Sequence, residues 1–246
     1  MKKYGLIGKK LSHSFSKDYF SKKFMDLGLT DYSYDLFPLE NISQIVDLIK
    51  ANPELQGFNI TIPYKEEIIP YLDSMEENAK EIGAFNVVKI KNNKLTGYNS
   101  DFFGFKSSLE NWYKPTKNNK ALVLGTGGAS KAVAAALGAL NIEFKYVSRD
   151  NQKASLTYNN FVDSPELILE YPLIINTTPL GMAPNTESMP ELPYAHLTSD
   201  HFLYDLVYNP TETKFLSLGK AQNCQVKNGL EMLHLQAEKS WEIWNS

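Results

Sequence analysis

Hydrophobic residues in the first half of this 246-residue chain gather in short runs, and amphipathic stretches separate these runs. Short apolar runs bounded by turn residues predict β-strands, and apolar residues spaced three and four apart predict helices. The predicted strands are Tyr4–Gly8, Tyr32–Phe37, Gly57–Ile62, Ala84–Ile90 and Lys94–Tyr98, the last two joined by a hairpin turn at Asn92-Asn93. The predicted helices are Lys17–Leu27, Leu39–Ala51, one or two within Glu66–Glu81, and Phe102–Trp112. This order predicts a compact α/β unit of roughly 100 residues, followed by a link at Tyr113–Asn119.

A second α/β pattern starts at the midpoint, in the stretch KALVLGTGGASKA. Ala121–Leu124 is an apolar run without alternation, which is typical of a strand buried on both faces. The strand is separated from a predicted helix, Ala129–Leu140, by a turn with three glycines, Gly125, Gly127 and Gly128. Such a turn opens a dinucleotide-binding fold, because glycine lets backbone N–H groups approach a pyrophosphate at the helix N-terminus. A turn without a ligand is the alternative, since the third fingerprint position is Ser130 rather than glycine.

The rest of the chain continues the alternation of strands and helices. The predicted strands are Ile142–Val147, Leu173–Asn176, Phe202–Val207 and Cys224–Lys227, and the predicted helices are Thr211–Lys220 and Leu230–Trp244. The segment Asn151–Phe161 is too short for a helix and a strand of usual length. The fold class is therefore α/β, with a second unit of the Rossmann type.

Polar residues follow predicted strands of the first unit, where open α/β sheets bind ligands. The loop after the first strand contains Ser12, His13, Ser14 and Ser16, whose hydroxyls can bind a carboxylate or simply cap the next helix. Lys65 follows the third strand and is well placed for chemistry, although most lysines are solvated surface residues. Asp101 follows the hairpin, and its structural alternative is the N-cap of the next helix.

Composition excludes several classes of function. The net charge is −3 and no basic block occurs, so nucleic-acid binding has no electrostatic basis. No apolar run reaches the roughly 18 residues of a membrane-spanning helix, and the N-terminal apolar segment is too short for a signal peptide. Cys224 is the only cysteine, and the four histidines lack metal-ligand spacing. We therefore expect no metal, no membrane association and a cytoplasmic location.

Arg149 is the only arginine among the 25 basic residues. It follows the second strand of the Rossmann-type unit, where this fold contacts the adenosine ribose. Its guanidinium offers a planar set of donors for a phosphate, and Lys153 could add a second positive charge. Asp150 favours the opposite interpretation, because a carboxylate here usually accepts from the free 2′-hydroxyl of NAD. An ordinary solvated pair of Arg149 and Asp150 is the third alternative.

Seven separated motifs, in the right order, resemble those of shikimate dehydrogenases over nearly the full chain. They are His13-Ser14-Phe15-Ser16, Asn59-Ile60-Thr61-Ile62-Pro63-Tyr64-Lys65, Gly83-Ala84-Phe85-Asn86, Gly97-Tyr98-Asn99-Ser100-Asp101, Asn176-Thr177-Thr178-Pro179-Leu180-Gly181-Met182, Asp205–Pro210 and Gly229–Ala237. Two departures are informative. Ser100 replaces a threonine of the family, and Ser148-Arg149-Asp150 replaces its usual Asn-Arg-Thr.

The resemblance implies two domains. Residues 1–101 and 229–246 would form a substrate-binding and catalytic domain, and residues 102–228 an NADP-binding Rossmann domain, with the last helix returning to the first domain. The implied activity is the reversible NADPH-dependent reduction of 3-dehydroshikimate to shikimate, in the biosynthesis of aromatic amino acids. The implied partners are this small-molecule substrate and NADP, in a monomer or homodimer.

The resemblance also implies the roles of individual residues. Lys65 and Asp101 would be catalytic. The substrate would be bound by Ser14, Ser16, Thr61, Asn86, Tyr208 and Gln236. The cofactor would be bound by Gly125, Gly127, Gly128, Ala129, Ser148, Arg149, Thr177, Gly229 and Met232.

Three rival functions remain open from the sequence. One is an NAD-preferring quinate/shikimate dehydrogenase. Another is a folate-linked dehydrogenase of similar two-domain shape, which the paired serines and Gln236 disfavour. The last is a nucleotide-binding regulatory module without catalysis, against which the presence of both Lys65 and Asp101 argues.

Overall fold

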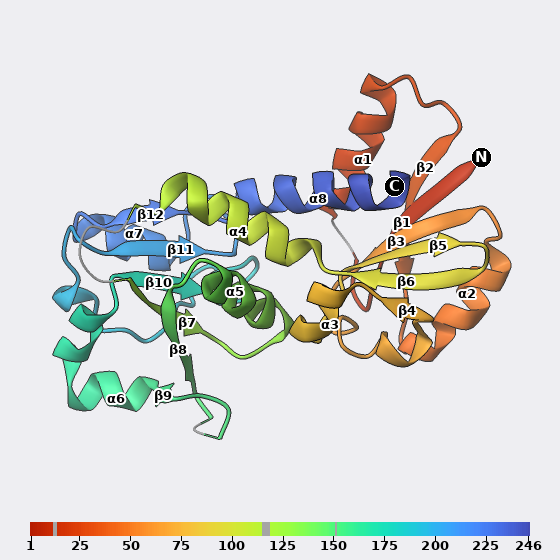
Figure 1. Cartoon of the computed structure of the whole chain (residues 1–246). Helices are drawn as coiled ribbons and strands as arrows, with labels where there is room; N and C mark the ends of the chain where they lie inside the picture. The colour runs from red at the N-terminus through yellow and green to blue at the C-terminus, as the bar shows by residue number, and fades with distance from the viewer. Residues whose placement is uncertain (12–13, 115–118, 151) are drawn as a thin grey trace. The chain divides into compact units, whose positions relative to one another are not determined.

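The computed structural model describes residues 1–11, 14–114, 119–150 and 152–246, which divide into two compact units. Unit 1 comprises Met1–Ser100 and Gln236–Ser246, and unit 2 comprises Asp101–Leu235. Each unit contains one six-stranded sheet (Figure 1). The predicted α/β fold class is thus confirmed. Four parts of the sequence-based prediction lie outside the described residues: Ser12, His13, positions 115–118 of the link, and Asn151.

The sheet of unit 1 has the strand order β2-β1-β3-β5-β6-β4. Strands β2, β1 and β3 run parallel, whereas β5 is antiparallel to both β3 and β6. Asn92 and Asn93 join β5 to β6 with φ angles of 52° and 59°, so the predicted hairpin turn is confirmed. The strands are β1 (Lys2–Gly8), β2 (Tyr32–Pro38), β3 (Leu55–Ile60), β4 (Ser74–Met75), β5 (Val87–Lys91) and β6 (Lys94–Tyr98).

Helices cover both faces of the unit 1 sheet (Figure 1). One face carries α1 (Phe15–Asp26) and the C-terminal part of α8 (Leu230–Asn245), packed through an aromatic cluster that includes Tyr4, Phe20 and Trp244. The other face carries α2 (Ile45–Ala51) and α3 (Glu77–Ile82) over a second apolar core that includes Ile7 and Phe58. Because successive strand residues point to opposite faces, β1 supplies Tyr4 to one core and Ile7 to the other.

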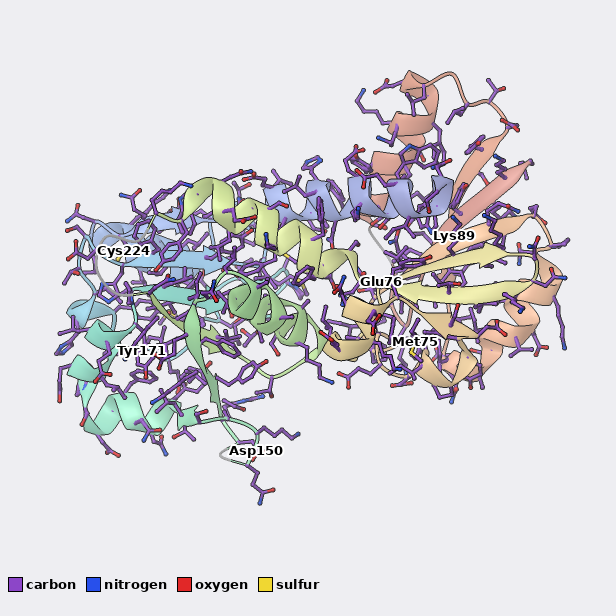
Figure 2. All side chains as sticks on the ribbon, viewed as in Figure 1. Met75, Glu76, Lys89, Asp150, Tyr171 and Cys224 are labelled. Atoms are coloured by element: carbon purple, nitrogen blue, oxygen red, sulfur yellow. The ribbon has the colours of Figure 1, made fainter. Side chains whose placement is uncertain are left out.

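The last helix docks on this sheet through close contacts. A Cβ atom on Gly57 would lie 2.5 Å from Cδ1 of Trp244, so the glycine permits the indole to reach the backbone of β3. The Trp244 Nε1 also donates to the carbonyl of Val88 at 3.0 Å. Lys89, on β5, donates to the main-chain oxygen and hydroxyl of Ser246 (Figure 2). The last helix therefore returns to unit 1, as the sequence predicted.

The sheet of unit 2 has the order β12-β11-β10-β7-β8-β9, with every pair parallel. Its first strand, β7, lies in the middle, and the chain adds neighbours first on one side and then on the other. This is the doubly wound order of dinucleotide-binding folds, so the Rossmann-type prediction is confirmed. The strands are β7 (Lys120–Leu124), β8 (Glu143–Ser148), β9 (Leu156–Thr157), β10 (Leu173–Asn176), β11 (Phe202–Asp205) and β12 (Gln225–Lys227).

Two apolar cores cover the two faces of the unit 2 sheet. One core includes residues of α4 (Ser100–Trp112) and α5 (Gly128–Ala139), and the other includes residues of α6 (Tyr158–Asp163) and α7 (Lys214–Ala221). Strand β7 sends Ala121 and Val123 to the first core and Leu122 and Leu124 to the second. An apolar run without alternation was therefore the right signal for a strand buried on both faces.

Several predicted elements were wrong in type or extent. The predicted helix Leu39–Ala51 is a 3₁₀ turn, Ile42–Gln44, followed by α2. The helical segment begins after Asn41 rather than at Leu39, because Asn41 forms a capping box with Gln44. The stretch Glu66–Glu81 contains a 3₁₀ turn, Ile69–Tyr71, and the short strand β4, which pairs with β6 and which no alternation in the sequence revealed. Between β8 and α6, the short strand β9 replaces the helix of a usual Rossmann crossover.

We predict that Trp244→Ala lowers the free energy of unfolding by about 3–5 kcal/mol, the usual cost of deleting a buried indole. Trp244 is only 6% exposed and packs its ring against Tyr4 with centroids 4.7 Å apart. Chemical denaturation followed by circular dichroism measures the change. Met25→Ala is the control, because Met25 is 73% exposed in the same unit and its truncation should change stability by no more than about 0.5 kcal/mol. Equal losses in the two variants would contradict the docking role.

Candidate active site

The predicted substrate residues of unit 1 lie in segments that adjoin one edge of its sheet. Strands β1, β3 and β6 end at this edge, and the antiparallel strand β5 begins there, since Asn59 pairs with Val87 and Val87 with Tyr98. The segments that leave this edge contain Ser14, Thr61, Lys65, Asn86 and Ser100. Carboxyl ends of strands are the usual ligand-binding edge of an open α/β sheet.

Ser14 is the N-cap of α1, and its hydroxyl accepts from the backbone N–H of Lys17 at 3.3 Å. The helix begins at Phe15 rather than at Lys17, so the capping alternative is confirmed for Ser14. Capping uses a lone pair of the hydroxyl and leaves its proton available, so it does not compete with donation to a carboxylate. Ser16 lies in the first turn of the helix.

The turn between β3 and Lys65 is anchored at several points. The backbone N–H of Thr61 donates to the carbonyl of Ile7 at 2.9 Å, which ties the turn to β1. Tyr64 is buried, and its hydroxyl donates to the carbonyl of Leu39 at 2.6 Å. The carbonyl of Lys65 accepts from the N–H of Phe85 at 2.7 Å. Lys65 and Asn86 are therefore held at neighbouring positions by the backbone, and the Lys65 side chain is half-buried.

Asn86 belongs to a buried hydrogen-bond network that the sequence did not reveal. Its side chain donates to the Ser100 hydroxyl at 3.0 Å and accepts from the Ser100 N–H at 2.7 Å. The Ser100 hydroxyl lies 3.3 Å from that of Ser240, which accepts from Asn59 Nδ2 at 2.9 Å. Asn59 Oδ1 in turn accepts from the Tyr34 hydroxyl at 2.8 Å. Uncharged side chains thus link the predicted substrate residue Asn86 to Tyr34 on β2.

The network also places Gln236. Trp244 lies at Gly57 and Ser240 at Asn59, so α8 runs antiparallel to β3. Four helical residues advance roughly 6 Å and two strand residues roughly 6.6 Å, which keeps the two elements in step. Gln236, four residues before Ser240 and bonded to it through its carbonyl at 2.9 Å, therefore reaches the level of Thr61.

Asp101 is 4% exposed and lies in the first turn of α4. The helix starts at Ser100, so Asp101 lies within it and the structural alternative, an N-cap at Asp101, is wrong. Ser100, the last residue of unit 1, is itself held by Asn86 through two hydrogen bonds. The backbone that leads into Asp101 is therefore fixed by a predicted substrate residue.

The glycine turn of unit 2 fits a pyrophosphate. Gly125 has φ +104°, and a Cβ there would lie 2.9 Å from Cγ2 of Thr178, so glycine is required by both conformation and space. Gly127 is exposed, and a Cβ there would meet nothing within 4 Å. It is the N-cap of α5 and has no side chain, so it cannot cap the N–H groups of the first helical turn, which includes Gly128 and Ala129. An open helix N-terminus of this kind favours an anionic ligand.

The segment after β8 carries the charged residues that the sequence predicts to lie near the adenosine ribose of the cofactor. Arg149 is exposed, and no hydrogen bond or ion pair joins its guanidinium to another side chain in the part of the chain that the structure describes. The carboxylate of Asp150, which is labelled in Figure 2, accepts from the N–H of Gln152 at 3.0 Å and lies 3.8 Å from Lys153 Nζ. Asp150 therefore pairs with Lys153 rather than with Arg149.

The other predicted cofactor residues and Tyr208 lie at or after strand ends of unit 2, except Met232, which lies in the first turn of α8. Thr177 donates its hydroxyl to the carbonyl of Leu124 at 2.6 Å, which holds it against the strand that enters the glycine turn. A Cβ on Gly229 would clash with the carbonyl of Leu206, so only glycine fits there. Ser148 accepts from the N–H of Asp150, Met232 is buried in a core of unit 2, and Tyr208 is 36% exposed.

Two kinds of feature do not occur within residues 1–11, 14–114, 119–150 and 152–246. No helix there is long and apolar enough to cross a membrane. No three histidine, cysteine, aspartate or glutamate side chains there are grouped so that they could hold a metal ion.

Comparisons with known proteins agree on one family. Residues 6–88 match the family model described as the shikimate dehydrogenase substrate binding domain. The NADP(+) shikimate dehydrogenase of Clostridium beijerinckii is 40% identical over 253 residues, which cover 99% of this chain and 92% of that protein. The shikimate 5-dehydrogenase of Thermus thermophilus, solved with NADP(H) and shikimate, is 30% identical with a TM-score of 0.86, over 99% of this chain and 93% of that one. The quinate dehydrogenase of Corynebacterium glutamicum, solved with NAD, is 25% identical with a TM-score of 0.88, over the same shares.

We predict that Gly127→Ala weakens dinucleotide binding roughly tenfold or more and changes stability by about 1 kcal/mol or less. The added methyl meets no protein atom within 4 Å, but it enters the space in which a pyrophosphate would approach the helix. Fluorescence titration with NADPH and thermal unfolding measure the two effects. Gly125→Ala is the contrasting variant, because its methyl would press on Thr178 and should lower stability as well. Undiminished NADPH binding by Gly127→Ala would mean that the turn is structural only.

Proposed function

The chain belongs to the shikimate dehydrogenase family, and we propose that it catalyses the reversible NADPH-dependent reduction of 3-dehydroshikimate to shikimate. Unit 1 would bind the substrate and unit 2 the nucleotide. Reduction of 3-dehydroshikimate is a step in the biosynthesis of aromatic amino acids, which gives the enzyme its metabolic role. The single observation that carries the proposal is the edge of the unit 1 sheet, where segments bearing Ser14, Thr61, Lys65 and Asn86 leave the strands.

The residues at this edge match the polar groups of the substrate. Hydroxyls of Ser14 and Ser16 would donate to the substrate carboxylate, and they bind an anion without burying a second full charge. Thr61, Asn86 and Gln236 would bind ring hydroxyls, and Tyr208 is a further proposed substrate residue. Asn86 suits this task because its amide is already oriented by two hydrogen bonds to Ser100, so little is lost on binding.

Lys65 and Asp101 would manage the proton. In reduction, Lys65 would donate a proton to the carbonyl oxygen as charge develops there, and in oxidation it would take the proton back. Asp101 would accept a hydrogen bond from a ring hydroxyl of the substrate. The backbone of Lys65 is anchored to Phe85 and that of Asp101 follows the anchored Ser100, so both groups are positioned before substrate arrives.

NADPH, when bound, supplies the hydride for the carbonyl carbon. The glycine turn and the first turn of α5 would bind its pyrophosphate, and Arg149 would bind the 2′-phosphate. Ser148 would support this segment, while Thr177, Gly229 and Met232 would line the nicotinamide end. The match of Arg149 to a phosphate rests on its exposed guanidinium and on the pairing of Asp150 with Lys153.

A second candidate function is oxidation of quinate with NAD. The similarity to the quinate dehydrogenase solved with NAD, with a TM-score of 0.88, supports this second candidate. Steady-state rates with shikimate and quinate, each with NADP and NAD, separate the two. The regulatory-module alternative predicts no turnover of any pair, and the folate-linked alternative predicts none with 3-dehydroshikimate.

A cytoplasmic location and a monomeric or homodimeric state complete the proposal. Both come from the sequence and the family resemblance. Light scattering coupled to size-exclusion chromatography measures the oligomeric state, and cell fractionation measures the location.

We predict that Lys65→Ala lowers kcat by about 10²–10⁴-fold, the usual contribution of a positioned acid–base group, and leaves the Kd for NADPH nearly unchanged. Because groups acting as a unit are non-additive, Lys65→Ala with Asp101→Asn should cost little more than the worse single change. Consumption of NADPH with 3-dehydroshikimate is the assay. Lys91→Ala, at an exposed lysine of the same sheet, is the control and should keep full activity. Near wild-type kcat in Lys65→Ala would remove Lys65 from the mechanism.

We predict that Arg149→Ala lowers the NADP:NAD preference roughly 10- to 150-fold, the equivalent of losing one charge-assisted hydrogen bond. Lys153→Ala should lower the preference less, because Lys153 chiefly compensates Asp150. The measurement is kcat/KM with each cofactor, with Lys94→Ala as a control for loss of one exposed positive charge. A wild type that prefers NAD, or an equal loss with both cofactors, would refute the assignment. In the NAD-preferring case, Asp150→Ala should shift the preference toward NADP.

A further inference from the structure

A buried carboxylate in unit 2 has no part in the function described so far. Asp205 is the last residue of β11 and is 0% exposed. Burial raises its pKa to about 6, and hydrogen bonds from Thr213, Val207 and Asn176 oppose that rise. At neutral pH the group is therefore mainly ionised. An ionised carboxylate without a cation is costly to bury, so its presence calls for a physical reason.

Both oxygens of Asp205 are occupied by donors. Oδ1 accepts from Asn176 Nδ2 at 2.9 Å and from the N–H of Val207 at 3.0 Å. Oδ2 accepts from the hydroxyl of Thr213 at 2.5 Å. The donors come from the end of β10, the segment after β11 and the N-cap of α7. One carboxylate thus holds three segments at the carboxyl edge of the sheet.

The carboxylate decides the orientation of the Asn176 amide. An ionised carboxylate can only accept, so Asn176 must present its Nδ2 to Asp205 and its Oδ1 to the opposite side. That oxygen accepts from both the N–H of Thr178, at 3.0 Å, and the hydroxyl of Thr178, at 2.6 Å. A flipped amide would set its NH₂ group against two donors. The charge at position 205 therefore fixes the position of Thr178 through Asn176.

Thr178 lies directly against the glycine turn. Its Cγ2 is the atom that a Cβ on Gly125 would meet at 2.9 Å, and the neighbouring Thr177 donates to the carbonyl of Leu124. A shift of the Thr177–Thr178 segment would therefore move the wall of the turn. On its other side, Val207 accepts at its carbonyl from the N–H of Gly229 at 3.3 Å, so Asp205 also supports that predicted cofactor residue.

We propose that Asp205 is a positioning residue for the dinucleotide site, where its carboxylate sets the Asn176 amide and thereby holds Thr177 and Thr178 against the glycine turn. This inference rests on the proposed function, which assigns Thr177 and the glycine turn to the cofactor. A purely structural role for Asp205 would stabilise the fold without affecting binding, and the two roles differ in measurable ways.

The matched variants are Thr178→Val and Thr213→Val. Each removes one hydroxyl donor from the same buried cluster and keeps the side-chain shape. The Thr178 hydroxyl donates to Asn176, and Thr178 packs against the glycine turn. The Thr213 hydroxyl donates to the other oxygen of Asp205, and Thr213 caps α7. Thr178→Val should raise the Kd for NADPH severalfold with little change in Tm. Thr213→Val should lower Tm and leave the Kd for NADPH near that of wild type.

The direct variants are Asp205→Ala and Asp205→Asn. Asp205→Ala should raise the Kd for NADPH roughly tenfold or more, because the Asn176 amide is released. Asp205→Asn should restore most of the affinity, because its remaining oxygen can still accept from Asn176 and Val207. Hydrogen–deuterium exchange of the cofactor-free full chain gives a second readout. Exchange at residues 177–182 should rise in Asp205→Ala and stay unchanged in Thr213→Val.

The outcomes separate this inference from the proposed function. Absence of NADPH binding and of 3-dehydroshikimate reduction in the wild type overturns the proposed function and, with it, the link from Asp205 to the cofactor. Where the wild type binds NADPH, equal Kd values for Thr178→Val and Thr213→Val overturn the inference alone. Unchanged exchange at residues 177–182 in Asp205→Ala also overturns it. Should Asp205→Ala fail to fold, the two valine variants decide the question.

Discussion

We call the sheet edge at the ends of β1, β3 and β6, where we propose that substrate binds, the substrate edge of unit 1. Its hydrogen-bond network depends on the docking of α8, the last helix in the sequence. Trp244 lies on the β3 backbone because Gly57 has no side chain, and the ring is held there by the carbonyl of Val88. One helical turn earlier, Ser240 meets Asn59 and Ser100. A further turn brings Gln236 to the level of Thr61. A change at Gly57 would therefore be felt at the substrate edge, although Gly57 itself would not touch the substrate.

The two units stabilise their functional edges by different means. Unit 1 uses a chain of amides and hydroxyls from Tyr34 to Asn86, which hydrogen-bond to one another without an ionised group. Unit 2 concentrates its buried contacts on a single carboxylate, Asp205. Burying a carboxylate costs more free energy than burying an amide. An ionised carboxylate can only accept hydrogen bonds, however, so an amide that faces it can adopt only one orientation. In unit 2 the buried charge of Asp205 therefore fixes the orientation of the Asn176 side-chain amide.

The departures from the family pattern acquire physical meaning in the structure. Ser100 replaces threonine in a position that is fully buried and makes three hydrogen bonds, through its N–H and its hydroxyl. The smaller residue keeps the hydroxyl, which is the group the network uses. Asp150 replaces a threonine beside Arg149, and the pairing with Lys153 and the N–H of Gln152 offsets its charge. The Asp150 carboxylate thus pairs with Lys153 rather than with Arg149, the residue that we propose binds the 2′-phosphate.

The sequence alone determined the features that depend on local chemistry. The apolar run Ala121–Leu124 and the glycines after it specify a buried strand and a sharp turn, because few other structures suit those residues. The ordered motifs also predict roles for Lys65, Asp101 and Arg149. Tertiary structure alone decided the features that depend on distant partners. Strand β4 forms because β6 lies beside it, and Ser240 becomes part of the substrate edge because α8 docks on β3. Asp205 gained its inferred positioning role only when folding buried it beside Asn176, since burial and hydrogen-bond direction are properties of the packed chain rather than of any local pattern.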